Sequence, residues 1–339
     1  MRVITLEEHF TSPLQTDKIK NQPRAVFKDR SAHLGHDIEA ELSDIGERRL
    51  AAMDAAGIDM QVLSLTQPGC ETFDADVAIS MARDANDLMY QAVKAHPTRF
   101  AAFAALPTPD PEAAVKEFER TIMKLGFRGA MINGHTRGSF LDDRKYWGIF
   151  DCAQAHDLPI YLHPAVPHSG LMQAYFQGFE DLSRAAWGFA IDASVHFLRI
   201  LFSGAFDEFP KLKIILGHMG EGLPFGMHRL GDHTGYVAKR RGLKRQPLEY
   251  MRDNLVITTA GAFSIPALLC SLLEVGADNV LFSVDWPYES NKVGAEFLKA
   301  LPISEHDREK IAHKNAERIL RLTVHSNDDC ERRGRRCPK

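Results

Sequence analysis

Short runs of aliphatic and β-branched residues alternate along this chain with longer segments in which apolar residues recur every three or four positions. The short runs predict buried strands, and the longer segments predict amphipathic helices. Strands that alternate with helices indicate a parallel sheet, because a parallel neighbour is reached only through a crossover connection. The eight runs that predict strands are 3–6, 60–65, 100–105, 129–132, 159–162, 213–216, 255–258 and 280–284.

Two α/β architectures fit this alternation: a doubly wound open sheet and a closed (β/α)8 TIM barrel. An open sheet that binds a dinucleotide carries a GxGxxG turn after its first strand, whereas this chain has EEHF (7–10) in that place. Eight units within 339 residues also fit a barrel with insertions. We therefore predict a barrel in residues 1–325. Two polar segments, 11–43 and 164–185, follow strands one and five and are predicted to be long active-site loops.

The charge balance limits the classes of partner. The chain has 41 lysines and arginines against 45 aspartates and glutamates, so a net charge of −4 gives it no overall attraction to nucleic acid or an anionic membrane. No run approaches the roughly 20 apolar residues that span a bilayer, and the first residues, MRVITLEEHF, lack the apolar core of a signal peptide. Five cysteines without a CxxC pair are typical of reduced thiols. We expect a cytoplasmic protein with no nucleic acid or membrane partner.

Ionisable side chains gather at the carboxyl ends of the predicted strands. Glu7 and His9 end strand one with a spacing of two, so both project to one side of the pleat. His163, His218 and Asp285 end or follow strands five, six and eight. In a closed barrel these ends converge on one mouth. A mixed carboxylate and imidazole set suits Zn, Mn or Fe, and we predict a metal site there rather than five unrelated structural residues.

The chain also resembles a known family. The segments that carry the resemblance are LEEHF (6–10), YLHP (161–164), IILGHMGEGLPF (214–225) and LFSVDWPYE (281–289). They resemble the metal-dependent decarboxylase branch of the amidohydrolase superfamily, most of all its γ-resorcylate (2,6-dihydroxybenzoate) decarboxylases. The resemblance covers about residues 1–323 and implies a barrel of the amidohydrolase type and a homo-oligomer, a dimer or tetramer. Residues 326–339 lie beyond it, carry four arginines around Gly334 without an apolar period, and are predicted to form a disordered basic tail.

The resemblance implies a set of metal ligands. One divalent ion per subunit, Zn²⁺ or Mn²⁺, would be bound by Glu7, His9, His163 and Asp285. Hydrolases of this superfamily that hold two metals generally need a bridging carboxylate, often a carboxylated lysine, at the end of strand four. This strand ends in MIN (131–133), without a lysine, so a mononuclear site is expected.

Four further residues take roles from the same resemblance. His218 and Glu221 would form an acid/base pair beside the metal, and their spacing of three predicts that they share one face of a helical turn. Arg229 would bind the carboxylate of the substrate, and Phe189 would line its aromatic ring.

The reaction implied is the non-oxidative decarboxylation of a hydroxylated aromatic acid. In this hypothesis the metal and Arg229 hold the carboxylate, Asp285 protonates the ring carbon that bears it, and CO₂ then leaves. No motif for pyridoxal phosphate, thiamine or a redox cofactor is found, so no organic cofactor is expected. A metal-dependent hydrolase of lactones, amides or esters and a hydratase remain alternatives on the same barrel, as does a scaffold that binds without turnover.

Overall fold

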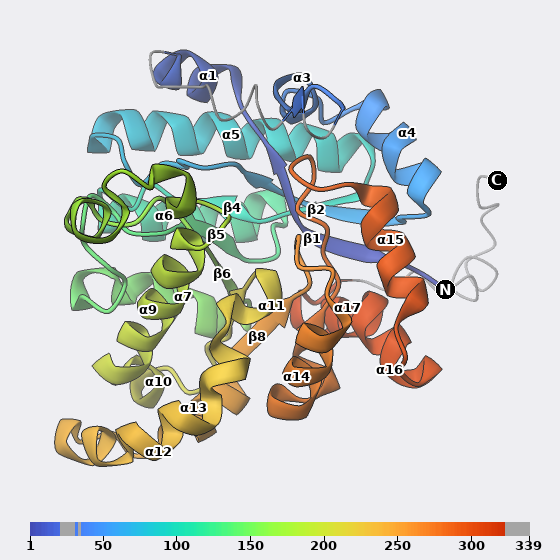
Figure 1. The fold of residues 1–339 in the computed structure, drawn as a ribbon. Coiled ribbons are helices and arrows are strands. Elements are labelled where there is room, and N and C mark those ends of the chain that lie inside the picture. Colours follow the sequence, from blue (N-terminus) through green and yellow to red (C-terminus); the bar gives the residue numbers. More distant parts are fainter. Residues whose placement is uncertain (21–30, 33–34, 323–339) are drawn as a thin grey trace.

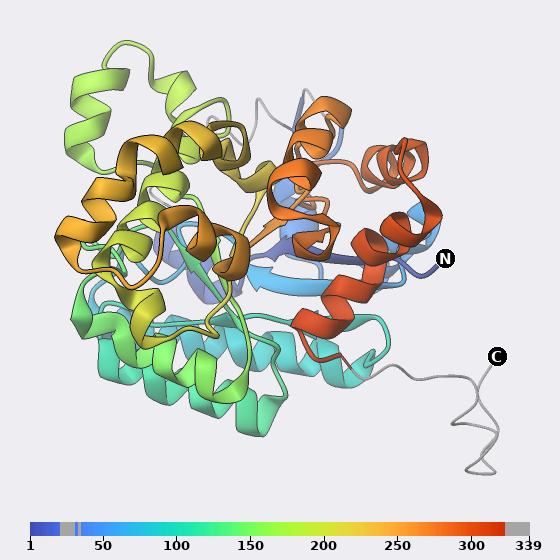
Figure 2. The same cartoon turned by 90° about the horizontal axis from the view of Figure 1, so that it is seen from below.

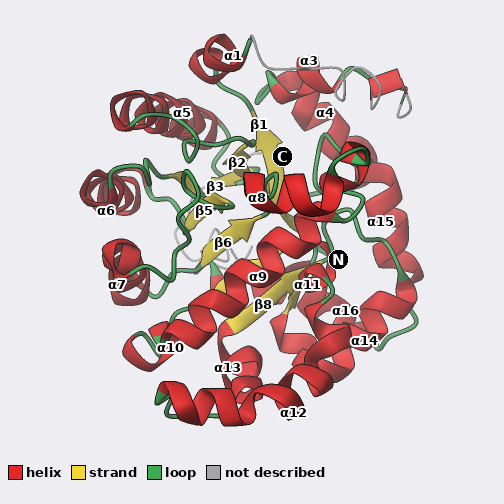
Figure 3. Ribbon diagram, turned by 60° about the vertical axis from the view of Figure 1, so that its left-hand side comes forward, coloured by secondary structure: helices red, strands yellow, loops and turns green. Residues whose placement is uncertain are grey.

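Parallel strands form the centre of the molecule, with helices arranged around them (Figures 1 and 3). This computed structural model describes residues 1–20, 31–32 and 35–322. The strands are β1 (Ile4–Phe10), β2 (Met60–Leu65), β3 (Phe100–Ala102), β4 (Ala104–Ala105), β5 (Ala130–Asn133), β6 (Ile160–His163), β7 (Ile214–Leu216), β8 (Leu255–Thr258) and β9 (Val280–Leu281). Strands β3 and β4 together fill the predicted run 100–105, and each of the others lies within three residues, at either end, of a predicted run, apart from the end of β1, which continues four residues further.

The strands follow one another around a barrel. Parallel pairing gives the orders β1-β2-β3 and β4-β5-β6-β7-β8-β9. Phe103 separates β3 from β4 and joins the two groups, because its N–H donates to Leu63 O while the next N–H, of Ala104, donates to Gly129 O, both at 2.9 Å. On the other side the N–H of His9 donates to Trp286 O at 2.7 Å. These bonds give eight strand positions in a ring, so the predicted (β/α)8 fold is confirmed.

Helices cover the outside of the strands on more than one side. Figure 2 shows the cyan and green helices of residues 75–156 on one side and the yellow and orange helices of residues 223–275 on the other. The α-helices are α1 (Pro13–Ile19), α3 (Ile38–Leu42), α4 (Glu47–Ala56), α5 (Ala75–Ala95), α6 (Pro111–Arg120), α7 (Trp147–His156), α8 (Ser169–Leu171), α9 (Gly188–Ser203), α10 (Ala205–Glu208), α11 (His218–Glu221), α12 (Leu223–Arg241), α13 (Pro247–Asn254), α14 (Ile265–Val275), α15 (Asn291–Ala300), α16 (Glu305–Glu309) and α17 (Asn315–Ile319). Short 3₁₀ or π turns are η1 (Thr121–Leu125), η2 (Arg144–Tyr146), η3 (Met172–Phe176), η4 (Glu180–Ser183), η5 (Ala277–Asn279) and η6 (Lys310–Lys314).

Local sequence explains where individual helices begin and end. At α6, the side chain of Asp110 accepts a hydrogen bond from the N–H of Ala113, and Pro111 occupies the first turn, where its missing N–H leaves no bond unmade. The helical segment ends after η1 at Gly126, whose φ of 72° is a left-handed conformation that glycine adopts without strain. Helix α14 begins in a similar way, with Ser264 as the capping residue and a proline in the first turn.

The inside of the barrel is filled by side chains from every strand except β4. They form a buried apolar layer of Ile4, Leu6, Met60, Val62, Ala101, Phe103, Met131, Tyr161, Ile215, Val256 and Leu281, closed at the amino-terminal end by residues of α17 and by Leu320. Because side chains alternate along a strand, the inward positions two residues further on lie at the carboxyl-terminal mouth. Asn133 and His163 occupy such positions at the ends of β5 and β6, where they are paired in register.

The two predicted loops contain short helices. Helices α1 and α3 lie in the 11–43 segment, and α8, η3 and η4 lie in the 164–185 segment. The predicted basic tail, 326–339, lies outside the described residues. By length and composition alone, one helical segment in the described chain, Glu180–Ser203, could cross a membrane, and 44% of its most apolar window is buried within the fold.

Candidate active site

Four side chains meet at the carboxyl-terminal mouth of the barrel. Glu7 and His9 come from β1, His163 ends β6, and Asp285 follows β9, and one ligand atom of each lies within 4.8 Å of the others. Glu7 Oε1 is 3.2 Å from His163 Nε2 and 3.9 Å from His9 Nε2, and His9 Nε2 is 3.3 Å from Asp285 Oδ1. The structure thus brings together all four residues that the sequence predicted as metal ligands.

This cluster fits a divalent cation. Glu7 Oε1, His9 Nε2 and Asp285 Oδ1 are buried and have no hydrogen-bond partner among the described residues. Buried polar atoms without partners are costly, and a cation would satisfy all three. Tetrahedral ligand bonds of about 2.1 Å place ligand atoms roughly 3.4 Å apart, close to the shorter separations in the cluster.

The electrostatics of the cluster also favour a cation. Burial acts to raise the pKa of Glu7, but the charge of His218 and the imidazoles of His163 and His9 close to its carboxylate outweigh it, and the pKa lies well below its ordinary value. Burial acts to lower the pKa of His9, yet Asp285 and Glu7 raise it to about 9. The two carboxylates therefore create a negative potential that attracts positive charge into a buried space.

The second oxygen of Glu7 is held from the opposite side. Tyr161 on β6 donates a short hydrogen bond to Glu7 Oε2, and the same hydroxyl lies 2.9 Å from Thr258 Oγ1. A Cβ at position 217 would lie 2.5 Å from Glu7 Oε2, so only glycine leaves room for this carboxylate. Tyr161 precedes His163 by two residues, so strand alternation could have pointed to it, although the sequence analysis did not assign it a role.

The predicted partner of His218 is in place, although the reason for the pairing differs from the prediction. His218 Nδ1 lies 2.6 Å from Glu221 Oε1, and His218 Nε2 lies 3.5 Å from Asp285 Oδ2. The turn that joins the pair is left-handed, with φ of 49° at His218, 58° at Met219 and 54° at Glu221. The prediction that His218 and Glu221 share one face of a right-handed helical turn is therefore wrong. Such conformations are uncommon outside glycine and concentrate at functional sites.

The two predicted substrate residues lie in neighbouring elements. Arg229 is exposed on α12, and Phe189 is half-buried in the first turn of α9. Within the described part of the chain, no hydrogen bond, ion pair or ring contact joins either residue to the cluster. The sequence analysis did not single out Arg184, whose charge acts on Tyr288: burial raises the pKa of Tyr288, and the charge of Arg184 opposes this. The ring of Tyr288 is 5.6 Å from that of His9, so the charge of Arg184 acts on a residue of the mouth.

Comparison with known proteins identifies the family. The sequence pattern of the amidohydrolase family matches residues 31–322. The chain belongs to the amidohydrolase family. It is 38% identical over 328 residues to the γ-resorcylate decarboxylase of a Polaromonas species, with 94% of this chain and 98% of that protein covered.

Two solved amidohydrolase structures are closely similar. A 2,6-dihydroxybenzoate decarboxylase complexed with 2,6-dihydroxybenzoate has a TM-score of 0.87 and 37% identity, over 95% of this chain and 100% of that one. A Polaromonas dihydroxybenzoic acid decarboxylase with bound manganese and the inhibitor 2-nitroresorcinol has a TM-score of 0.86 and 38% identity, over 95% and 97%. The expected family and fold are thus both confirmed.

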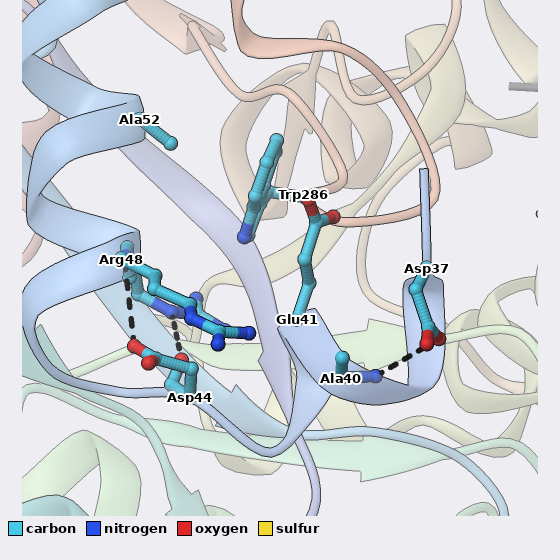
Figure 4. A pocket seen from close by; sticks show the side chains of 8 residues that line it. Asp37, Ala40, Glu41, Asp44, Arg48, Ala52 and Trp286 are labelled. Atoms are coloured by element: carbon cyan, nitrogen blue, oxygen red, sulfur yellow. Dashed lines mark hydrogen bonds between the residues drawn. The ribbon is translucent and has the colours of Figure 1, made fainter. Parts of the chain in front are cut away.

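A small cavity lies beside the cluster of four candidate metal ligands. One of its walls is formed by Trp286, the residue that follows Asp285. Figure 4 shows the indole of Trp286 at its wall, with Glu41 and Asp37 of the α3 region and Asp44 and Arg48 nearby. Its volume is about 220 Å³. Three carboxylates and two arginines, Arg48 and Arg49, line it, so it offers an aromatic acid no net positive charge. The open side of the cluster, at Asp285, whose side chain is 14% exposed, is the better approach for such a substrate.

Proposed function

We infer that this chain is a metal-dependent carboxy-lyase that removes CO₂ from a hydroxylated aromatic acid without oxidation. The observation that carries this conclusion is the cluster of two carboxylates and two imidazoles at the barrel mouth, in a chain 38% identical to a γ-resorcylate decarboxylase. The solved relative holds manganese and a nitroresorcinol. The substrate that we propose is therefore a hydroxybenzoate with a hydroxyl group ortho to its carboxylate.

The proposed cofactor is one divalent ion per subunit, Mn²⁺ or Zn²⁺, held by Glu7, His9, His163 and Asp285. When bound, it would supply the positive charge that holds a carboxylate and an ortho hydroxyl together. Support for a single ion comes from β5, which ends in Asn133 beside His163 and offers no bridging ligand. Tyr161, by its bond to Glu7, would fix the orientation of that carboxylate.

The proton would reach the ring through His218 and Asp285. Burial opposes the charged form of His218, but the negative charges of Glu221 and Glu7 raise its pKa well above the ordinary value, which favours the protonated imidazole. His218 Nε2 would pass this proton to Asp285 Oδ2, 3.5 Å away. The Asp285 side chain is 14% exposed, whereas that of Glu7 is fully buried.

Asp285 would then deliver the proton to the ring carbon that carries the carboxylate. The bond from that carbon to the carboxylate breaks, its electron pair restores the aromatic ring, and CO₂ leaves. One proton is consumed in each turnover and is replaced from solvent through His218. Glu221 would keep His218 oriented and favour its protonated form.

Two arginines are candidates for binding the substrate carboxylate. Arg229 is proposed from the family resemblance, and Arg184 from the effect of its charge on Tyr288. An arginine fork matches a carboxylate in geometry and charge. Substitution of methionine for the arginine that performs this role should raise KM and leave the metal content unchanged. Phe189 is proposed to lie against the ring of the substrate.

We also propose a homo-oligomer. Large apolar side chains are exposed in the segment between β6 and α9: Tyr175, Phe179, Leu182 and Trp187 are 69%, 66%, 48% and 64% exposed. An apolar patch of this kind is typical of an interface between subunits. Sedimentation of the intact protein would test the proposal.

The decisive experiment combines metal, substrate and a proton-donor variant. Protein loaded with Mn²⁺ or Zn²⁺ is incubated with a panel of hydroxybenzoates, and CO₂ release is followed against loss of the acid. We expect Asp285→Asn to retain metal and to lose turnover by a factor of about 10²–10⁴, while the exposed Asp232→Asn on α12 serves as the matched control. Full activity of Asp285→Asn would refute the proton-donor role. Cleavage of lactones, amides or esters without CO₂ release would favour the hydrolase alternative.

A further inference from the structure

A second carboxylate of β1, that of Glu8, lies fully buried between the two candidate metal ligands of this strand. It accepts four hydrogen bonds. Oε1 receives them from the N–H of Val284 at 3.1 Å and from Ser283 Oγ at 3.3 Å. Oε2 receives them from the N–H of Trp286 at 3.2 Å and from Gln61 Nε2 at 3.3 Å. Glu8 therefore joins β1 to the segment that follows β9.

The two backbone groups bound by Glu8 are those on either side of Asp285. Asp285 itself has a φ of 78°, in the left-handed region, which is strained for a residue with a side chain. The conformation persists only where the surroundings hold it, and here one carboxylate holds both neighbouring N–H groups. The position of Asp285 is thereby tied to a residue whose own chain neighbours are Glu7 and His9.

An irregularity in β1 makes this arrangement possible. Thr5 pairs with Gln61 and Glu8 pairs with Leu63, so β1 takes three steps while β2 takes two. The extra residue is a β-bulge, which re-aims the side chains that follow it. Leu6 consequently packs inside the barrel while Glu7, the next residue, also faces inward to the cluster. In a regular strand Leu6 and Glu7 would face opposite sides, and one of the two would point out of the barrel.

A buried arginine supports the same carboxylate from behind. Arg49 of α4 is 1% exposed. It donates to Gln61 Oε1 at 3.3 Å, to the carbonyl of Asp44 at 2.9 Å, and, in a short bond, to the carbonyl of His9. Gln61 in turn donates to Glu8. The guanidinium thus holds the backbone of one candidate ligand directly and the carboxylate of Glu8 through a single side chain.

We propose that Glu8, supported by Arg49 through Gln61, is a positioning residue that sets the geometry of the metal site by fixing Asp285 relative to Glu7 and His9. The proposal rests on the metal-binding part of the proposed function. Glu8 does not contact the metal in this proposal. It acts by holding three of the four ligands, and its loss should change metal affinity and coordination geometry before it changes the fold.

The test uses the full chain, with Mn²⁺ and Co²⁺ as probes. In Glu8→Gln the side chain keeps nearly the same shape, but an NH₂ group replaces one carboxylate oxygen. This group faces two of the donors that bond to Glu8, so two hydrogen bonds are lost. We expect Mn²⁺ affinity, measured from the electron paramagnetic resonance of free Mn²⁺, to fall by a factor of about 10–100. We also expect the visible absorption of the Co²⁺-loaded protein to change in position or intensity, which a purely structural role would not cause.

Two further variants make the test discriminating. Glu117→Gln removes the charge from a carboxylate that accepts bonds from Asn86 and Arg120 between α5 and α6, far along the chain from any ligand, and should leave affinity and Co²⁺ spectrum unchanged. Ser283→Ala removes the hydroxyl that accepts from the N–H of Glu7 at 2.7 Å and donates to Glu8. It should shift both readouts in the same direction as Glu8→Gln, by less, and it decides the question if Glu8→Gln does not fold.

The outcomes separate this proposal from the proposed reaction. Unchanged affinity and spectrum in Glu8→Gln, or in Ser283→Ala where Glu8→Gln is unfolded, would overturn the positioning role. A parent protein that binds Mn²⁺ but decarboxylates none of the hydroxybenzoates would overturn the reaction and leave this test in force. A parent protein that binds neither ion would overturn both.

Discussion

The histidine that is buried on α9 should make this protein sensitive to acid. His196 is fully buried, and its Nε2 accepts a hydrogen bond from the N–H of Leu141 at 2.8 Å. Burial, with the charges of Arg199 and His135, lowers the pKa of His196 to about 3 from an ordinary 6.5. Between these values the unfolded chain binds a proton that the folded chain does not. Stability is therefore present above pH 6.5 and is lost as the pH falls toward 3.

The size of this effect follows from the two pKa values. Between pH 7.5 and pH 5, protonation of the unfolded chain at His196 should lower the free energy of unfolding by about 2 kcal/mol. His196→Gln removes the titration and keeps an acceptor for Leu141, so the contribution is isolated as the difference between parent and variant. The free energy of unfolding of both proteins is measured by urea denaturation at both pH values. Relative to the variant, the parent should be about 2 kcal/mol less stable at pH 5 than at pH 7.5.

An exposed histidine on α12, His228, gives the matched control, since His228→Gln should leave the same difference nearly constant. A shift of less than about 0.5 kcal/mol for His196→Gln, too small for a histidine excluded from protonation, would refute the reasoning. It would mean that the folded protein accommodates the charged imidazole. The comparison with the control removes contributions from every other group that titrates in this range.

Three other predictions follow from the structure. Burial raises the pKa of Glu71 to about 8 although the N–H of Asn133 opposes it, so this residue lowers the stability of the fold as the pH rises from about 4.5 to 8. Between pH 5 and 7.5 the free energy of unfolding of Glu71→Gln, measured by urea denaturation, should increase relative to that of the parent by about 1.4 kcal/mol per pH unit. A difference in free energy that does not change with pH would contradict this. Tyr161→Phe removes the hydrogen bond to Glu7, so Mn²⁺ affinity measured by titration should fall about 10–100-fold, and an unchanged affinity would count against the support of Glu7. Removal of metal with a chelator should destabilise the protein by about 2.7 kcal/mol relative to protein at 100 times the dissociation constant, and identical melting curves would speak against a bound ion.

Much of the fold could be read from the chain. The strand predictions at 60–65 and 255–258 match β2 and β8 residue for residue, because a parallel strand buried on both faces is rich in apolar residues and so stands out along the chain. The division of strand three at Phe103 was not predicted, since it depends on which neighbour each N–H finds. The four candidate ligands were predicted together for a similar reason, because parallel strands bring their carboxyl ends to one mouth.

The substrate residues and the support of the cluster were less accessible. Arg229 and Phe189 were named by resemblance, and the structure places them on α12 and α9 without a described contact to the cluster. Arg184 gave no signal because it lies in a segment without period. Glu8 was overlooked because it lies between Glu7 and His9, and strand alternation predicts that it points away from the mouth. Its hydrogen bonds to the segment after β9 depend on a β-bulge, which has no signature in the sequence.

The sequence alone determined the barrel, the family and the identity of four side chains able to hold a divalent ion, since these depend on periodicity and on residue type at strand ends. Only the tertiary structure decided how those side chains are held. His218 and Asp285 adopt left-handed conformations, and the bonds from Glu8 to the N–H groups of Val284 and Trp286 join segments about 280 residues apart. Hydrogen bonds of this kind are directional and short in range, so they exist only once the ring of strands has closed.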